Sequence, residues 1–246
     1  MRSTTRVGAA LLAAALAGAA AADGEIATYR ALYRVEYRGK PLGTSEFSVG
    51  YDARQNTYRF ESRTTPKGLL KLVTPNPVVE RSDFRVQDGE VQPLEFWYED
   101  GSRKGEDNLH VVFDWEKKIA EVVGENGRIQ LPLQAGVLDR GSMQVALMRD
   151  LAVNGRPERY LLADGDSLKT YEYTADGEHV IATGIGEVPT LAFVQQRESS
   201  SRSTRLWFAA TLQYLPVRIE QRKDGEIQTA FTLESVEGLG VDSAAR

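Results

Sequence analysis

Cysteine is absent from the 246 residues of this sequence. The chain therefore cannot form a disulfide, use a thiolate as a nucleophile or bind a metal through sulfur. An N-terminal lipid would also need a cysteine, so we expect no lipoprotein anchor. The folded protein must therefore be stable without covalent cross-links. The hydrophobic fraction of 41% is enough to form a hydrophobic core.

Catalytic patterns are scarce as well. The sequence has two histidines, His110 and His179, and no G-x-S-x-G segment that would mark an activated serine. Asp164-Gly165-Asp166 begins like a calcium loop, but Leu168 stands where the third ligand would be. Acidic residues elsewhere fall in turn-like segments, where solvated carboxylates are ordinary. We therefore expect no enzyme activity, no metal and no cofactor.

An excess of basic charge is also missing. The chain has 30 Lys and Arg against 35 Asp and Glu, which gives a net charge of −5, and the two signs are interspersed. Because nucleic-acid binding needs a basic face, we expect no nucleic-acid partner.

Long hydrophobic runs are limited to the N-terminus. Arg2 and Arg6 precede an Ala-rich apolar stretch, Val7 to Ala22, that ends in small residues. This pattern is typical of a secretory signal peptide over residues 1–22, whereas a transmembrane anchor would need a longer and more strongly apolar run. We expect residues 23–246 to be exported to a bacterial periplasm, to have no membrane span and to form a single β-rich domain.

Most of the chain after the expected signal peptide alternates between apolar and polar residues. The stretch Tyr29 to Tyr37 shows this clearly, with one face apolar and the other rich in arginine. Asp-Gly pairs, at residues 88–89, 164–165, 176–177 and 224–225, indicate turns between strands. The sequence predicts a mainly β fold: a single large curled antiparallel sheet of about a dozen strands, as a half-barrel or a closed barrel.

One stretch, Leu138 to Leu151, has helical character instead. Asp139 is a good N-cap, Met143, Leu147 and Leu151 repeat at helical spacing, and Asn154-Gly155 supplies a stop. The helix is apolar on most sides, which favours burial on the concave side of the sheet over a role as a surface connector.

A second interruption lies between Pro66 and Pro75. Leu69, Leu70 and Leu72 are grouped there without strand alternation. They fit either a hydrophobic lid or a loop tucked under the core.

Several short patterns together resemble a known family, the bacterial exported proteins that carry domain of unknown function 3108. The matching positions are Tyr33-x-Val35, Gly43, Phe47, Asp139-x-x-Ser142, Ala146-Leu147-x-x-x-Leu151, Tyr171-x-Tyr173, Gly184 and Leu215–Glu220. The sequence departs from the family pattern at Arg140-Gly141, where we expect proline or an apolar residue. The expected architecture is also similar to the half-barrels of periplasmic lipoprotein and lipid carriers, which is an analogy of fold.

Two functions are consistent with these features. The protein binds a lipid or another apolar envelope ligand in the concave sheet, or it is a non-enzymatic envelope interaction or structural protein whose cavity is filled by its own helix. Asp139 and Ser142 are either a helix cap or polar contacts at a pocket mouth. The candidate ligand-binding residues are Leu69, Leu70, Leu72, Trp97, Asp139, Ser142, Met143 and Leu147.

Overall fold

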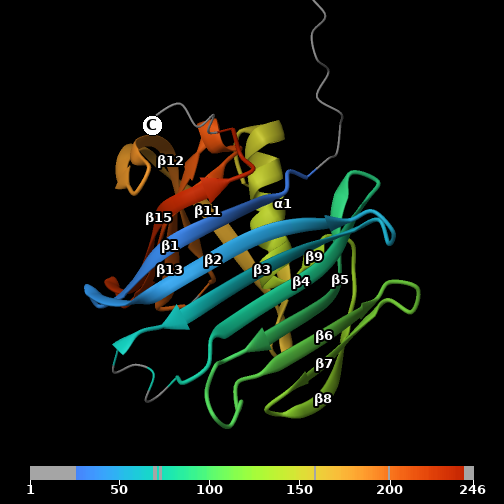
Figure 1. The fold of residues 1–246 in the computed structure, drawn as a ribbon. Coiled ribbons are helices and arrows are strands. Elements are labelled where there is room, and N and C mark those ends of the chain that lie inside the picture. Colours follow the sequence, from blue (N-terminus) through green and yellow to red (C-terminus); the bar gives the residue numbers. More distant parts are fainter. Residues whose placement is uncertain (1–25, 69–70, 72–73, 158, 199, 241–246) are drawn as a thin grey trace, which may run out of the picture.

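The computed structural model describes residues 26–68, 71, 74–157, 159–198 and 200–240. The expected signal peptide, 1–22, and the lid residues Leu69, Leu70 and Leu72 lie outside these residues. The described part folds as fifteen strands in one sheet, one α-helix, α1 (Arg140–Asn154), and the 3-10 turn η2 (Ala210–Leu212) (Figure 1).

The strands follow one another closely along the chain. They are β1 (Tyr29–Tyr37), β2 (Lys40–Asp52), β3 (Thr57–Pro66), β4 (Val78–Gln87), β5 (Glu90–Glu99), β6 (Leu109–Asp114), β7 (Ile119–Gly124), β8 (Gly127–Pro132), β9 (Val137–Leu138), β10 (Tyr160–Asp164), β11 (Ser167–Thr183), β12 (Gly186–Gln196), β13 (Arg202–Ala209), β14 (Leu215–Lys223) and β15 (Glu226–Glu237).

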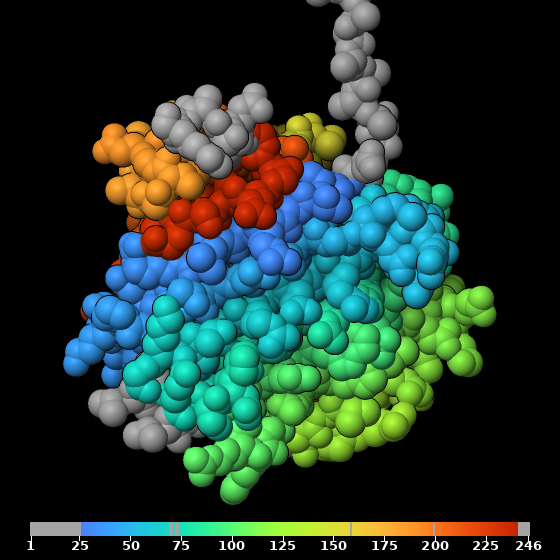
Figure 2. All heavy atoms as spheres, viewed as in Figure 1, coloured from blue at the N-terminus to red at the C-terminus, as the bar shows by residue number. Residues whose placement is uncertain are grey.

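The sheet has the order β8-β7-β6-β5-β4-β3-β2-β1-β15-β14-β13-β12-β11-β10-β9. Neighbours are antiparallel except β9 and β10, which are parallel because α1 connects them. Figure 2 shows the red C-terminal strand directly beside the blue N-terminal strand. The mainly β, curled half-barrel prediction is confirmed, although the sheet has fifteen strands rather than about a dozen.

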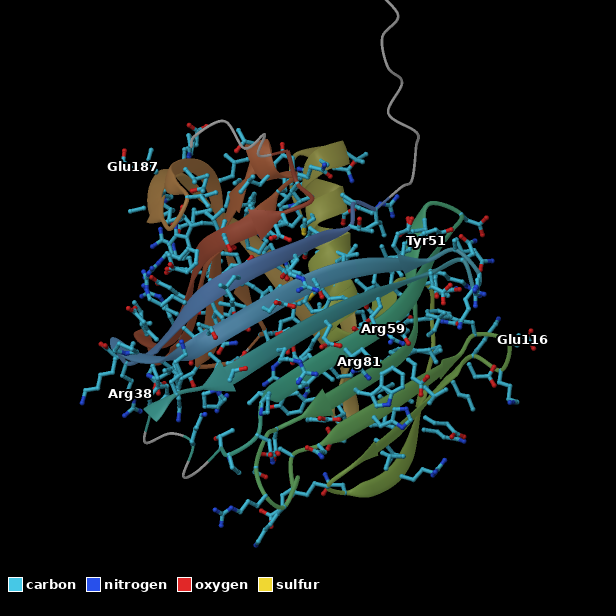
Figure 3. All side chains as sticks on the ribbon, viewed as in Figure 1. Arg38, Tyr51, Arg59, Arg81, Glu116 and Glu187 are labelled. Carbon is cyan, nitrogen blue, oxygen red and sulfur yellow. The ribbon has the colours of Figure 1, made fainter. Side chains whose placement is uncertain are left out.

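Alternation along each strand decides which side chains enter the core. On β1, Tyr33 and Val35 are buried on the concave side, and Arg34 lies exposed on the convex side. The same convex side carries Arg59 and Arg81 on β3 and β4, as Figure 3 shows. The sheet is therefore apolar inside and charged outside, as the sequence pattern predicts.

Two hydrophobic clusters fill the concave side. The larger one surrounds α1, whose residues Val145, Leu147 and Leu151 are buried; α1 packs against β3, β4, β5 and β10. The smaller cluster lies between β5–β8 and β9–β10 and includes Phe96, with Val137 opposite it. The two ends of the sheet thus face each other across a hydrophobic seam without pairing. The burial expected for the helix is confirmed.

Gly141 explains the departure from the family pattern at the start of α1. A Cβ atom at this position would lie 2.7 Å from Cβ of Ser82 and 2.9 Å from Cδ1 of Phe60. Both distances are well inside van der Waals contact, so a larger residue would push the helix away from β3 and β4. Glycine is needed here for the close approach of the helix to the sheet.

We expect Gly141→Ala to lower the free energy of unfolding by about 1–3 kcal/mol, because overpacking outweighs the better helix propensity of alanine. Urea denaturation measures this. Gly50→Ala is the matched control: its Cβ would meet nothing within 4 Å, and the change should stay within about 0.5 kcal/mol. Equal stability of the two variants would contradict the close approach.

One predicted turn is wrong. Asp176-Gly177 does not end a strand but forms a bulge inside β11, where Ala175 pairs with Phe193 and Glu178 with Leu191. Gly177 has a φ of 80°, and glycine at positive φ serves a bulge as well as a hairpin turn. Directly after the end of β11 the chain contacts β15, where the Gly184 N–H donates to the Leu233 carbonyl at 2.8 Å.

Candidate functional site

Asp139 and Ser142 form a closed capping box at the start of α1. The Asp139 carboxylate accepts hydrogen bonds of 2.8 Å from the backbone N–H groups of Gly141 and Ser142, and one of 2.8 Å from the Ser82 hydroxyl on β4. The Ser142 hydroxyl accepts from the Asp139 N–H at 2.9 Å. Both side chains are fully buried, so their polar atoms are used within the fold. Burial raises the pKa of Asp139 to about 6, although these hydrogen bonds partly oppose the shift.

The candidate residues described by the structure do not converge on one site. Leu147 is enclosed between helix and sheet, and the Met143 sulfur accepts from the Tyr173 hydroxyl at 3.4 Å. Trp97 lies on the opposite, convex face, where its ring stacks on His110 with centroids 5.3 Å apart. A single apolar site made of these side chains is not present in the described structure.

A pocket of about 280 Å³ lies instead beside the first residue of α1. It opens at the seam, between the β7–β8 hairpin, the start of β6 and the β10–β11 turn, and we call it the Arg140 pocket. Its lining consists of Tyr98, Asp107, Asn108, Leu109, Val122, Gly124, Glu125, Asn126, Gly127, Ile129, Arg140, Asp164, Gly165 and Asp166. A second pocket, of about 550 Å³, includes Trp97 and His110 and shares the β7–β8 turn with the first.

Arg140 is the central charge of the pocket. Its Nη1 lies 3.2 Å from Oε1 of Glu80, and its Nε lies 3.8 Å from Oδ1 of Asp164. The guanidinium also lies 4.6 Å from the ring centre of Tyr98 and 5.3 Å from that of Phe96. Nε is buried and has no hydrogen-bond partner among the described residues. Arg140 is thus held by charge and by rings rather than by well-formed hydrogen bonds.

Asp164 anchors the other side of the pocket. It accepts from Lys169 Nζ at 3.2 Å and from the Tyr171 hydroxyl at 3.0 Å. Burial by itself would raise the pKa of Asp164, but the charges of Arg140 and Lys169 hold it below its usual value. Burial and the Asp164 charge raise the pKa of Tyr171 to about 12. The carboxylate is therefore ionised and the phenol protonated near neutral pH.

No motif in the sequence predicts this site. The one sign of the site in the sequence is Arg140, a charged residue at the start of a helix that is otherwise apolar on most sides. Among the described residues, no group of three or more His, Asp or Glu side chains is arranged to hold a metal ion. In the same part of the chain, no helix is long and apolar enough to cross a membrane.

Comparison with solved structures gives distant likenesses. A β-barrel-like protein of domain of unknown function DUF1849 from Brucella abortus is 8% identical, with a TM-score of 0.49, over 86% of this chain and 98% of that one. A complex of Pseudomonas aeruginosa MucA and MucB gives 10% identity and a TM-score of 0.34, over 85% of this chain and 51% of that one. A candidate lipoprotein from Parabacteroides distasonis is 8% identical, with a TM-score of 0.36, over 87% of this chain and 97% of that one.

Likenesses this weak do not assign a function. No curated protein matches the sequence. The family described as "Protein of unknown function (DUF3108)" matches residues 32–232, which is most of the sequence and includes both the capping box and the Arg140 pocket. The chain therefore belongs to the DUF3108 family.

Proposed function

We propose that this protein is a non-enzymatic envelope protein that works by contact with another protein, with its concave trough filled by its own helix. The observation that carries this proposal is the packing of α1: Leu147 and Leu151 have 0% exposure beneath the curled sheet. An acyl chain could enter between helix and sheet only if α1 left, and the larger hydrophobic cluster would then be exposed.

The two pockets also support a protein that works by contact rather than a lipid carrier. Sites for apolar cargo are lined mainly by hydrophobic side chains. The Arg140 pocket carries charges on Asp107, Asp164 and Arg140, and the second pocket carries Glu99 and Glu106. Neither pocket includes Val145, Leu147 or Leu151, the buried apolar residues of α1.

The two histidines support a non-enzymatic role. His110 on β6 lies 2.7 Å from Glu95 on the convex face, and the His179 ring on β11 lies 2.8 Å from the backbone oxygen of Asp176. A serine hydrolase with a Ser-His-Asp triad would need such a ring within hydrogen-bond reach of the serine hydroxyl. Each ring is hydrogen-bonded to another kind of group.

The N-terminal sequence, rather than the fold, supports export as part of this proposal. The arginines before the Ala-rich run, residues 7–22, are typical of secretion. The proposed partner is accordingly an envelope protein that meets this one in a periplasm.

Native mass spectrometry of the chain from Asp23 onward, purified from a bacterial periplasm, tests whether the trough is filled. We expect the mass of the bare chain, no lipid in an organic extract and no uptake of added palmitate or phospholipid. A fatty-acid-binding protein carried through the same steps shows that the method detects such cargo. A lipid mass that recurs between preparations would show that α1 leaves room for a ligand, and would overturn the proposal.

The contact itself is tested by a photo-crosslinking residue at exposed positions, one at a time, in living cells. Arg59 on the convex face and Val153 at the end of α1 are suitable because both are exposed. A discrete adduct of constant mass from one position, and none from the other, would locate the contact surface. A survey of exposed positions over every strand that gives no adduct would count against an interaction protein.

A further inference from the structure

We propose that the Arg140 pocket binds a neutral polyhydroxylated ligand, one or two sugar units of a glycan. The proposal goes beyond the contact function above and does not depend on it. It rests on the side chains that the seam brings together: a half-buried guanidinium, carboxylates, amides and an apolar wall within one small pocket.

The pocket has the size and shape of a small-molecule site. Its volume of about 280 Å³ is close to the lower end of the usual range, which begins at roughly 300 Å³. Leu109, Val122 and Ile129 supply an apolar wall from β6, β7 and β8. The turn from Asp164 to Asp166 supplies a polar wall from the other end of the sheet. A ligand here would contact both ends of the open sheet.

Arg140 can donate hydrogen bonds to an acceptor on the ligand. Its side chain keeps 32% of its surface exposed although it packs on Tyr98, and it lines the pocket. Its contacts with Glu80 and Asp164 are ion pairs of 3.2 and 3.8 Å. A guanidinium has five N–H donors in a fixed plane, so donors remain for an oxygen of the ligand.

The carboxylates of the pocket can accept hydrogen bonds from donors on the ligand. Four of them line the pocket, Asp107, Glu125, Asp164 and Asp166, against the single guanidinium of Arg140. Asp164 already accepts from Lys169 and Tyr171, and Asp166 accepts from the Ser167 hydroxyl. Each carboxylate has several lone pairs, so acceptor positions remain for a ligand. An ionised carboxylate only accepts hydrogen bonds. Asn108 and Asn126 add amide groups, which both donate and accept.

Three ligand classes can be compared on these grounds. An anion would satisfy Arg140 but face four carboxylates. An ammonium group or a metal ion would satisfy the carboxylates but would offer Arg140 no acceptor. A hydroxyl group donates and accepts from the same atom, so a ligand with several hydroxyls serves both kinds of partner. The C–H face of a sugar ring would then pack on the apolar wall.

The experiment is saturation-transfer NMR with glucose, galactose, N-acetylglucosamine and its dimer as probes, and with ethanolamine and phosphate as representatives of the other two classes. The full chain from Asp23 is used. We expect at least one sugar to bind and neither charged probe to bind. Binding of ethanolamine or phosphate in preference to every sugar, or no sugar signal from the folded protein, would overturn the proposal.

Paired variants place the binding in this pocket. A double variant, Asp166→Ala with Asn126→Ala, lacks two exposed polar groups of the pocket lining. Its affinity for the sugar should be about tenfold weaker or more. Glu187→Ala is the control, because Glu187 is exposed near the start of β12 and does not line the pocket (Figure 3). Circular dichroism verifies that both proteins are folded. Equal sugar affinity of the two variants would show that the sugar binds elsewhere. Lipid uptake in the mass-spectrometry test would leave this result unaffected, so the two proposals fail separately.

Discussion

Leu147→Ala should lower the free energy of unfolding by about 3–4 kcal/mol, since it removes a fully enclosed side chain and leaves a cavity. Leu147 has 0% exposure and lies in the larger hydrophobic cluster between α1 and the sheet. Urea denaturation followed by tryptophan fluorescence measures the change, and the chain has three tryptophans to report it.

Val153→Ala is the control for this prediction. Val153 lies on the same helix but is 78% exposed, so its loss should change stability by no more than about 0.5 kcal/mol. If the two variants were equally stable, α1 would not fill the trough. The proposed function would then lose the observation that carries it.

The second large effect concerns the pH dependence of stability at Asp139. Burial raises the pKa of this carboxyl from 3.8 to about 6 in the folded protein. The folded state therefore holds the proton more tightly than the unfolded state. The resulting stabilisation is fully present below about pH 4 and is lost as the pH rises through about 6, a change of about 3 kcal/mol.

Asp139→Asn isolates this component, because an amide oxygen can still accept from Gly141 and Ser142 but does not titrate in this range. Unfolding free energies of both proteins are measured by urea denaturation from pH 4 to pH 7.5. Their difference should grow in favour of Asp139→Asn by about 2.5 kcal/mol over that interval. Other titrating groups, such as Glu220, contribute equally to both curves and cancel. Parallel curves would mean that Asp139 does not titrate abnormally.

The helix and its cap could be predicted because their signals are local. Asp139 supplies the N-cap and Gly155 the left-handed C-cap, and the helix occupies the residues between them. The strands around α1 could also be predicted. The alternation of apolar and polar residues within a strand of five or more residues can be recognised without knowing how that strand pairs with its neighbours. The Asp-Gly pairs at 88–89, 164–165 and 224–225 do join consecutive strands.

The bulge at Asp176-Gly177 could not be separated from a turn by sequence. Both need a residue with positive φ, and the difference depends on whether β12 continues to pair with β11 beyond that point. That pairing is a property of the assembled sheet. The predicted strand was therefore split where the folded strand is continuous.

The Arg140 pocket was beyond prediction for a similar reason. Its walls come from segments near Tyr98, Leu109, Val122, Arg140 and Asp164, and none of these segments has a pattern that refers to the others. They meet because the two ends of an open sheet curl toward one seam. Of the candidate residues chosen from the sequence, Asp139, Ser142 and Leu147 are buried within the fold.

The position of β15 has a consequence for how the chain reaches its folded state. Every other pair of neighbouring strands in the sheet is also consecutive along the chain, whereas β1 and β15 pair from opposite ends, with Arg30 opposite Glu237. This one pairing joins two meanders that can each form early from local hairpins. Until β15 has been delivered, by synthesis or by export, both halves keep an open inner edge, the kind of edge on which chains associate wrongly. The last of the described strands lies beside β1, the central strand of the sheet. Its arrival, rather than any earlier hairpin, therefore joins the two halves.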